Sequence, residues 1–593
     1  MKIPHESRED HHHGVSAKVN DCVFYGSGGK RKFWTVVATY AVLLTTISCV
    51  VLLFDSETRQ DPFAMISLGH WWRPSSRHGL VTDHHTKDWR NILVKESSNY
   101  STTLTSLLRA NATIYSYCEG SATNITKLEG LPNSANGKVS LQTDELHHLT
   151  LVAYDENGAK RCAGGDYYEV DLHDRENAYY RSRLPTQDFG NGSYGLELLV
   201  PSRFAGVFTL EIFILYGNWH GMEAETSAWV RKDLILSQEL EMVVGENLDK
   251  FNPGKDSSIK QCTPADFDRS TWQGRWTRSW YNPTCEPEVW SLRYKCLPEE
   301  HYNCEEPWCF GPVGRLESNG WQYSAHCSFK IFEREEAWKC LNGKWFMMWG
   351  DSNFQDTVRN LLLFILEWSL PFPQKLSEFQ LPRTYDMAFT NSHAYDQLFR
   401  VTQIFNGAHN LKENGEGLNT LLRHREHQEL LLAYFNGTKW PDAIVMNSGL
   451  HDAHAFPTIE EYVEAADSVI EFWTRIYDDL PADRRPRLIW RATVAPAGIG
   501  RDMSANPMKM EMLNQVMAER LQRVHDRLPV MFVDAFDLTF PFHYDNQFSD
   551  GGHYGRAPGV NLWPWHRKPH WYFVDITLAH ILLNGLCPTS ASD

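Results

Sequence analysis

The sequence lacks an excess of positive charge. Its 593 residues carry a formal net charge of -17 at pH 7, and the acidic residues are spread along the chain rather than gathered into a tail. Proteins that bind nucleic acid neutralise phosphates with clustered lysine and arginine. The charge balance therefore argues against a nucleic-acid partner.

The sequence also lacks long apolar runs, with one exception. Residues 33–54 are 22 consecutive positions without a charge, with Lys30, Arg31 and Lys32 before them and Asp55 after them. This length spans a hydrocarbon core, and the preceding cations place residues 1–32 in the cytosol. The run is too long for a cleavable signal peptide. We therefore expect a single-pass type II membrane protein held by a signal anchor.

Glycosylation sequons are absent before this run and present after it. They lie at Asn99, Asn111, Asn124, Asn191 and Asn436. Ten of the twelve cysteines also follow the run, namely Cys118, Cys162, Cys262, Cys285, Cys296, Cys304, Cys309, Cys327, Cys340 and Cys587. An even number of cysteines in an oxidising compartment predicts disulfide bonds. We expect a glycoprotein of the secretory pathway. Residence in the Golgi is favoured, and display at the cell surface or release after cleavage is the alternative.

The length and composition predict more than one globular unit. Hydrophobic residues make up 42% of the chain and aromatic residues 13%, including 22 tryptophans, which suffices for buried cores. Residues 55–105 are polar without a sustained period, as expected of a stem. Residues 106–245 contain short alternating apolar runs separated by turn signals, which predict a β-sandwich of the immunoglobulin or filamin kind. The strand candidates there are 139–141, 149–154, 194–200 and 207–216.

Residues 246–341 are rich in cysteine and tryptophan and lead into the last domain. Seven cysteines lie between Cys262 and Cys340, without the paired C-x2-C units typical of zinc sites. Disulfides are favoured over zinc, and we predict no metal site. Because seven is odd, one of these cysteines pairs elsewhere, and Cys587 is a candidate partner.

Residues 342–593 alternate between short apolar strands and amphipathic helices. The strand candidates are 345–349, 401–405, 443–446, 488–494 and 530–533, and the helix candidates are 354–366, 418–435, 459–477, 508–527 and 572–583. This alternation predicts a three-layer α/β domain with a parallel sheet. Ligands bind such sheets at the carboxyl ends of the strands.

This domain lacks the Gly-x-Ser-x-Gly elbow of α/β-hydrolases, which argues against a lipid esterase. It has instead a strand that runs into Gly350-Asp351-Ser352 at the start of a helix. Such a turn exposes the serine hydroxyl and directs backbone N–H groups at a developing oxyanion. An isolated Gly-Asp-Ser is more often only a helix cap.

A carboxylate and an imidazole follow the last predicted strand. Asp550 and His553 are three residues apart, so that one turn can deliver both groups: the carboxylate orients the imidazole, and the imidazole takes the serine proton. Asn447 and Gly407 each follow another strand, where they could donate to an oxyanion. Asn447 could equally be a turn residue.

The order and placement of these residues resemble the SGNH (GDSL-type) hydrolases, and more specifically the PC-esterase branch, which includes plant polysaccharide O-acetyltransferases and animal sialic-acid O-acetyltransferases. Residues 188–217 resemble filamin-type and neurexophilin-type immunoglobulin-like repeats. Together the two parts, over roughly residues 105–590, resemble the neurexophilin and PC-esterase domain family.

The resemblance implies that Ser352 is the nucleophile, His553 the general base and Asp550 the residue that orients it. It implies oxyanion donors at the Ser352 N–H, the Gly407 N–H and the Asn447 side chain. The sequence departs from the broad SGNH pattern in its third block, where Gly-x-Asn-Asp is usual. Here that block reads Asn447-Ser-Gly449-Leu-His451-Asp452. His451 and His454 form an H-x-x-H pair that we expect to contact substrate or to be structural rather than to bind metal.

The implied function is a glycan O-acetyltransferase or O-acetylesterase that forms a serine acyl-enzyme on a glycan or glycoprotein substrate. No bound cofactor is expected, and a transferase would need a luminal acyl donor such as acetyl-CoA. The alternative is a non-catalytic, neurexophilin-like adhesion or receptor-ligand glycoprotein whose immunoglobulin-like domain binds a surface protein.

Overall fold

The computed structural model describes residues 122–132, 139–174, 179–217, 230–244, 261–269, 272–278, 284–285, 318–369, 381–407, 416–497, 505–543, 549–555 and 573–587. The chain divides into two units, Met1–Leu80 and Val81–Asp593, and all described residues belong to the second. The predicted tail, membrane span and stem lie outside the described residues. Within the described part, no helix is both long and apolar enough to cross a membrane.

The predicted β-sandwich is present. One sheet has the strand order β1-β3-β7-β6, with β1 at Ile125–Glu129, β3 at His147–Tyr154, β7 at Ser193–Leu198 and β6 at Thr186–Asp188. The other sheet has the order β11-β10-β5-β4-β8-β9-β2. Side chains alternate between core and surface along β8 (Gly206–Tyr216), where Phe208, Leu210 and Ile212 are buried. This period-two pattern closes the core between the two sheets.

Two strands of the second sheet come from the cysteine- and tryptophan-rich region. β10 (Arg275–Thr277) pairs antiparallel with β5 (Tyr180–Arg183) and with β11 (Gln322–Ser324). The remaining strands are β2 (Val139–Gln142), β4 (Tyr167–Asp174) and β9 (Val230–Val243). Trp276 is fully buried, and its ring lies edge-on to those of Phe542 and Phe573 from the α/β domain. The region thus extends the sandwich sheet and also contributes to the core of the α/β domain.

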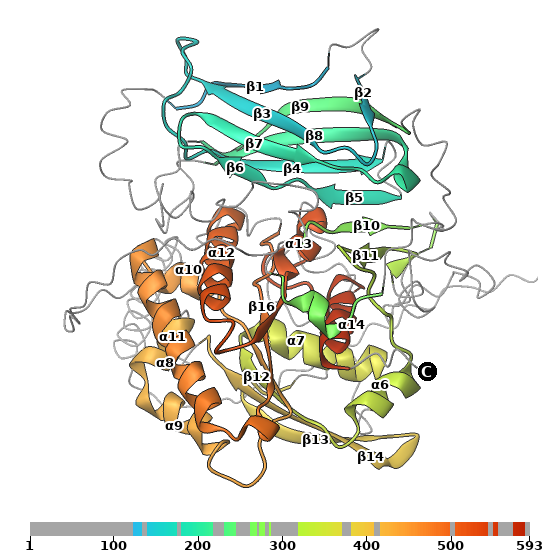
Figure 1. Cartoon of the computed structure of the whole chain (residues 1–593), viewed down its shortest axis with the longest axis vertical. Helices are drawn as coiled ribbons and strands as arrows, with labels where there is room; N and C mark the ends of the chain where they lie inside the picture. Colours follow the sequence, from blue (N-terminus) through green and yellow to red (C-terminus); the bar gives the residue numbers. More distant parts are fainter. Residues whose placement is uncertain are drawn as a thin grey trace, which may run out of the picture. The chain divides into compact units, whose positions relative to one another are not determined.

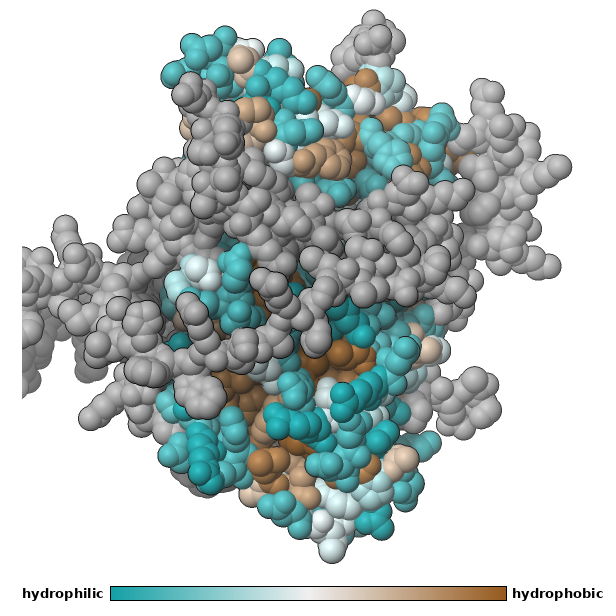
Figure 2. All heavy atoms as spheres, turned by 60° about the vertical axis from the view of Figure 1, so that its left-hand side comes forward, coloured by the Kyte–Doolittle hydropathy of each residue, from teal (hydrophilic) through white to brown (hydrophobic). Residues whose placement is uncertain are grey.

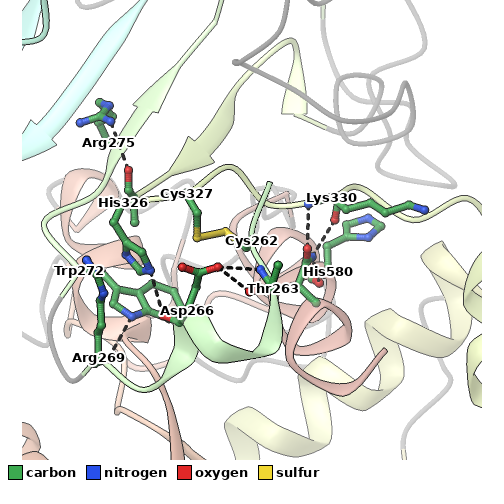
Figure 3. The surroundings of a disulfide bond; sticks show 12 residues. Cys262, Thr263, Asp266, Arg269, Trp272, Arg275, His326, Cys327, Lys330 and His580 are labelled. Carbon is green, nitrogen blue, oxygen red and sulfur yellow. Dashed lines mark hydrogen bonds between the residues drawn. A yellow bond between two sulfur atoms is a disulfide. The ribbon is translucent and has the colours of Figure 1, made fainter. Parts of the chain in front are cut away.

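Two disulfides between described residues link this region internally and to the last helix. Cys262 pairs with Cys327, and Cys340 pairs with Cys587. The predicted preference for disulfides, and the prediction that a cysteine of this region pairs with Cys587, are confirmed. Figure 3 shows the first disulfide beside Asp266, whose carboxylate accepts hydrogen bonds from the backbone N–H and the hydroxyl of Thr263.

The α/β domain has a six-stranded sheet in the order β13-β14-β12-β15-β16-β17. β14 (Ala394–Phe405), β12 (Trp345–Gly350), β15 (Ala443–Met446), β16 (Arg487–Arg491) and β17 (Val530–Val533) are parallel. β13 (Tyr385–Asn391) runs antiparallel at the edge and was not predicted. The predicted parallel sheet is confirmed, and its order places β12 between β14 and β15.

Helices cover both faces of this sheet (Figure 1). Phe346 and Met348 on β12 pack into a core with α6 (Arg334–Leu341), α7 (Ser352–Asn360) and α14 (Phe573–Leu586). Met347 and Trp349 face the opposite core, formed with α8 (Leu418–Arg423), α9 (Arg425–Ala433), α11 (Ile459–Asp479) and α12 (Pro507–Arg523). Both faces of β12 are therefore buried, as in other parallel sheets.

Several predicted elements differ in their extent. The strand expected over 401–405 begins at Ala394, and the helix expected over 508–527 ends at Arg523. The helix expected over 354–366 consists of α7 followed by a π-helical turn, Leu361–Ile365. The helix expected over 418–435 is interrupted at His424, and the strand expected to end at Val494 ends at Arg491. Two short helices, α10 (Asp452–Ala455) and α13 (Ala535–Thr539), were not predicted.

The surface of the described part is chemically mixed. On the face shown in Figure 2, hydrophobic areas are bordered by hydrophilic residues. Some large hydrophobic side chains that reach solvent stand alone, such as Ile125 on β1 and Leu234 on β9, whereas Tyr395 and Leu398 are both on β14. Scattered exposure of this kind is ordinary for globular proteins.

Candidate active site

Ser352 is the first residue of α7, at the carboxyl end of the central strand β12. The preceding Asp351 caps the helix, and its carboxylate accepts the backbone N–H of Asn353 at 2.9 Å. Gly350 allows the sharp turn, since a Cβ there would collide with the ring of Phe354. The first N–H groups of a helix have no intrahelical acceptor, and the positive end of the helix dipole lies at the same end of the helix. Ser352 is therefore placed where its own N–H can bind an oxyanion.

The hydroxyl of Ser352 contacts a histidine that lies 201 residues away in sequence. Ser352 Oγ is 2.6 Å from His553 Nε2. His553 Nδ1 lies 3.0 Å and 3.2 Å from the two carboxylate oxygens of Asp550. Donation from Nδ1–H to the carboxylate leaves Nε2 free of a proton, so that it can accept the serine hydroxyl. The structure thus brings the three predicted catalytic residues into one hydrogen-bonded chain.

The turn that carries Asp550 and His553 is held by its own backbone. Asp550 Oδ1 accepts the N–H groups of Gly552 at 3.1 Å and His553 at 2.8 Å. Gly551 has a φ of +112°, which glycine adopts without strain. The side chain of Asp550 is 5% exposed and that of His553 is 16% exposed, so the pair is shielded while Nε2 remains reachable from Ser352.

Gly407 follows the strand next to β12, at the same edge of the sheet as Ser352. β14 pairs with β12 up to Phe405 and Gly350, and the N–H of Asn406 donates to the Gly350 carbonyl at 3.1 Å. Gly407 follows directly. No described residue accepts a hydrogen bond from the backbone N–H of Ser352 or Gly407. Both N–H groups are thus candidate donors to a ligand at the carboxyl end of the sheet.

Asn447 does not present its amide to this site, contrary to the expectation for the third oxyanion donor. Its Nδ2 donates to the Arg491 carbonyl at 2.9 Å and to Thr493 Oγ1 at 3.3 Å, and the residue is buried. Both amide protons are therefore used to tie the end of β15 to the end of β16. Sequence reasoning failed here because a strand-end position does not reveal which way the side chain turns.

Gly449 and His451 lie on the loop that follows Asn447. Gly449 packs against Thr493, where any side chain would collide with the threonine hydroxyl, so this glycine is required for packing rather than for chemistry. The imidazole of His451 lies against Gly407, because an added Cβ on Gly407 would be 2.6 Å from Nε2. Its ring is edge-on to that of Phe405, with centroids 5.9 Å apart.

Burial lowers the pKa of His451 below its ordinary value. Asp351 opposes this shift, whereas the nearby His553 and Arg383 add to it. His451 thus favours its neutral form more than a free histidine does, and it lies close enough to His553 for the charges of the two rings to interact. On the same loop, burial raises the pKa of Asp452 to about 6. Its carboxylate accepts the Leu418 N–H at 2.8 Å and the Ser448 hydroxyl.

Arg383 is a site residue that sequence reasoning missed. It is exposed, and its guanidinium lies 4.9 Å from the centre of the Phe405 ring. It precedes the edge strand β13, which was not recognised in the sequence. No motif marks the position, since only the antiparallel pairing of β13 with β14 brings it to the end of β14.

The described residues contain one cluster with metal-ligand geometry, namely Asp266, His326 and Cys327. It lies outside the serine site, and Figure 3 shows that the Cys327 sulfur is bonded to Cys262. That sulfur is not a thiolate ligand, and His326 Nε2 lies 2.9 Å from the Asp266 carbonyl oxygen. The pattern His451-x-x-His454 is not part of any such cluster among the described residues.

Three of the predicted glycosylation positions fall on described residues, and all three asparagines are exposed: Asn124, Asn191 and Asn436. Asn191 lies in the turn between β6 and β7, where its side chain accepts the Ser193 N–H at 3.0 Å. Asn99 and Asn111 lie outside the described residues.

Comparisons with known proteins give low similarities. No family model and no curated protein matches the sequence. Among solved structures, an acetylxylan esterase from Geobacillus stearothermophilus has 14% identity and a TM-score of 0.24, and the match covers 42% of this chain and 96% of the esterase. An α/β hydrolase from the metagenome of Lake Arreo, Spain, has 15% identity and a TM-score of 0.23, with 42% and 98% covered.

The Lin-41 filamin domain has 12% identity and a TM-score of 0.15, and the match covers 21% of this chain and all of that domain. All three likenesses are low in identity and in TM-score.

Proposed function

We propose that this protein transfers acyl groups through an ester on Ser352, acting on O-acyl groups of glycans as an O-acetylesterase or O-acetyltransferase. The observation that carries the proposal is the contact between Ser352 Oγ and His553 Nε2 at 2.6 Å, with Asp550 on the other ring nitrogen. This is the arrangement in which a serine hydroxyl is activated by a general base.

In the first half of the reaction, Ser352 Oγ attacks the acyl carbon and its proton passes to His553 Nε2. Asp550 stabilises the resulting imidazolium through Nδ1. The oxyanion that forms is stabilised by the N–H groups of Ser352 and Gly407. When the tetrahedral intermediate collapses, the bond from the acyl carbon to the leaving alcohol breaks, and His553 returns the proton to that alcohol.

The second half reverses these steps with a new acceptor. Water or a sugar hydroxyl gives its proton to His553 and attacks the acyl-enzyme, after which Ser352 Oγ leaves and regains the proton. Hydrolysis and transfer share every protein group in this scheme. They differ only in the acceptor that reaches the acyl-enzyme.

Support for a glycan substrate comes from the sequence resemblance to glycan O-acetyltransferases and from the predicted type II topology, with residues 55–593 on the luminal or extracellular side. A transferase in that location would use a luminal donor such as acetyl-CoA. The predicted Golgi location and the predicted single membrane anchor belong to this proposal.

The competing function is that of a non-catalytic adhesion or ligand glycoprotein. A β-sandwich is compatible with it, since such modules commonly bind other proteins. A scaffold has no need of a serine, a histidine and an aspartate in hydrogen-bonding order, and this order favours catalysis.

Acyl-enzyme trapping tests the proposal. The full-length protein is incubated with a fluorophosphonate probe, alongside Ser352→Ala and His553→Ala. We expect labelling of the wild type at Ser352 and loss of labelling in both variants. A folded, glycosylated wild type that takes up no probe would favour the binding protein. Activated acetyl esters with and without added glycans then separate hydrolysis from transfer.

A further inference from the structure

The proposed oxyanion site has two backbone donors, and the sequence resemblance implies a third. The Ser352 N–H comes from the start of α7 and the Gly407 N–H from the end of β14, and no described residue engages either group. The loop after β15 flanks the serine on the other side, since β12 lies between β14 and β15 in the sheet. A third donor is therefore expected from this loop, the segment that contains Asn447 and His451.

Asn447 cannot serve, because its two amide protons go to the Arg491 carbonyl and the Thr493 hydroxyl. Thr493 is itself fixed, since its N–H and its carbonyl both bond to the side chain of Asn514. Turning the amide of Asn447 over would place its oxygen against the Arg491 carbonyl, which is repulsive. The orientation of Asn447 is thus determined by the structure around it.

His451 is the side chain of the same loop that does reach this place. Its Nε2 lies against Gly407, so the edge of the ring is next to the Gly407 backbone. Phe405 packs edge-on to the imidazole and limits its rotation. No hydrogen bond links the ring nitrogens of His451 to another described side chain or backbone group. The ring is also half-buried, which strengthens any hydrogen bond that it makes to a developing charge.

We propose that His451 Nε2–H is the third oxyanion donor, taking the role that the sequence resemblance assigned to Asn447. This inference rests on the proposed function, because it gives His451 a role within acyl transfer to and from Ser352. The neutral imidazole donates to the acyl oxygen as negative charge develops on it, while His553 remains the group that moves protons. The two histidines therefore have different tasks in one site.

Acylation by a small ester tests this role without any sugar contact. The full-length wild type, His451→Phe and His451→Gln are mixed with p-nitrophenyl acetate, and the release of p-nitrophenolate in the first turnover is followed. Loss of one oxyanion donor reduces the rate by about 100- to 1,000-fold. We expect a loss of that size in His451→Phe, because phenylalanine keeps the ring but has no donor. His451→Gln keeps an N–H donor and is expected to retain much more of the rate.

His393→Phe serves as the control, because it changes an exposed histidine in the turn before β14, at the opposite end of that strand from Gly407. It is expected to react at close to the wild-type rate. Thermal unfolding of each variant identifies any that fails to fold. If a folded His451→Phe variant acylates as fast as the wild type, the donor role is wrong. A wild type that releases no p-nitrophenolate and takes up no fluorophosphonate would overturn the proposed function and this inference together.

A structure of the phosphonylated wild type provides a second measurement that is independent of rates. The phosphonyl oxygen on Ser352 occupies the place of the oxyanion. We expect it about 3 Å from His451 Nε2 and at a similar distance from the N–H groups of Ser352 and Gly407. An adduct whose oxygen points away from His451, or toward a reoriented Asn447 amide, would contradict the assignment.

Discussion

Arg183 and Glu511 form a buried ion pair between the two described domains. The guanidinium of Arg183, at the end of strand β5 in the sandwich, lies 2.7 Å from the Glu511 carboxylate on α12, and the side chains are 10% and 7% exposed. Asp537 lies 3.4 Å from the same guanidinium, and the Tyr167 hydroxyl donates to Glu511 at 2.8 Å. A second buried pair, Glu169 with His543 at 2.8 Å, crosses the same boundary.

These contacts indicate that the sandwich packs against the α/β domain rather than forming an independent module. Glu511 is three residues from Asn514 on the same helix, and Asn514 fixes Thr493, which supports the loop of Asn447 and His451. Burial lowers the pKa of Arg183, but Glu511 and Asp537 more than offset this, so that it lies above the ordinary value. The charge on Arg183 is thus retained.

We expect Arg183→Met to lower the free energy of unfolding by about 3–5 kcal/mol, because it leaves buried carboxylates without their cation. Urea unfolding of the full-length protein measures the loss. Arg425→Met is the control, since Arg425 and its partner Glu429 are 86% and 59% exposed, and a change below about 1 kcal/mol is expected there. Equal losses in the two variants would show that the buried Arg183–Glu511 pair stabilises the folded state no more than the exposed Arg425–Glu429 pair does.

Gly407→Ala is expected to slow acylation of Ser352 by about 100-fold. The new Cβ would lie 2.6 Å from His451 Nε2 and would displace the imidazole and the Gly407 backbone from one another. First-turnover release of p-nitrophenolate measures the effect. Gly437→Ala is the control, because its Cβ would make only ordinary contacts, the nearest at 3.7 Å. If Gly407→Ala is acylated as fast as the wild type, the Gly407 N–H does not bind the oxyanion.

The stability of the sandwich is expected to fall as pH rises from about 4 to about 7 through Asp188. Burial raises the pKa of Asp188 to about 7, against about 3.9 in an unfolded chain. In this window the folded state holds a proton that the unfolded state has released, so raising the pH favours unfolding. The full contribution is up to about 4 kcal/mol, present below pH 4 and lost by the time the pH has passed 7.

Melting temperatures of the wild type and Asp188→Asn between pH 5 and pH 8 test this prediction. The variant is expected to show a smaller fall with pH, whatever its absolute stability, because asparagine does not titrate. Asp233→Asn, at a carboxylate on β9 that is 50% exposed, controls for removal of a charge from the same domain. If the melting temperature falls equally with pH in the wild type and in Asp188→Asn, Asp188 does not cause the pH dependence of stability.

The disulfide between Cys340 on α6 and Cys587 after α14 closes a loop with a sequence separation of 247 residues. Replacing both cysteines with serine is expected to lower the free energy of unfolding by about 2–5 kcal/mol, mainly because the unfolded chain gains freedom. Urea unfolding under non-reducing conditions measures the loss. Peptide mapping that finds either cysteine as a free thiol in the wild type would contradict the pairing.

Much of the α/β domain could be predicted from local pattern. Strands β15 and β17 were predicted with the bounds that the structure shows, and β12 within one residue, because buried parallel strands are short continuous apolar runs. The edge strand β13 was missed because its exposed positions interrupt such a run. In the sandwich, β4 and β5 were missed for a similar reason, since polar residues occur at several of their positions.

The sequence by itself determined the three residues of the serine site. Gly350-Asp351-Ser352 follows a strand and opens a helix, and Asp550 and His553 are close enough for one turn to hold both, so short-range geometry suffices to orient each group. It also predicted a partner for Cys587, because an odd number of cysteines in one region leaves one over.

Only the tertiary structure decided the direction of side chains on the third loop and the placement of the sandwich strands. The turn of Asn447 toward Arg491 and Thr493, and of His451 toward Gly407, depends on groups 40 or more residues away in sequence. The pairing of β10 with β5 likewise depends on a partner strand distant in the chain. Several conformations of such a loop or strand are equally favourable locally, and hydrogen bonds and packing with distant segments stabilise one of them. A local sequence pattern therefore cannot predict which conformation forms.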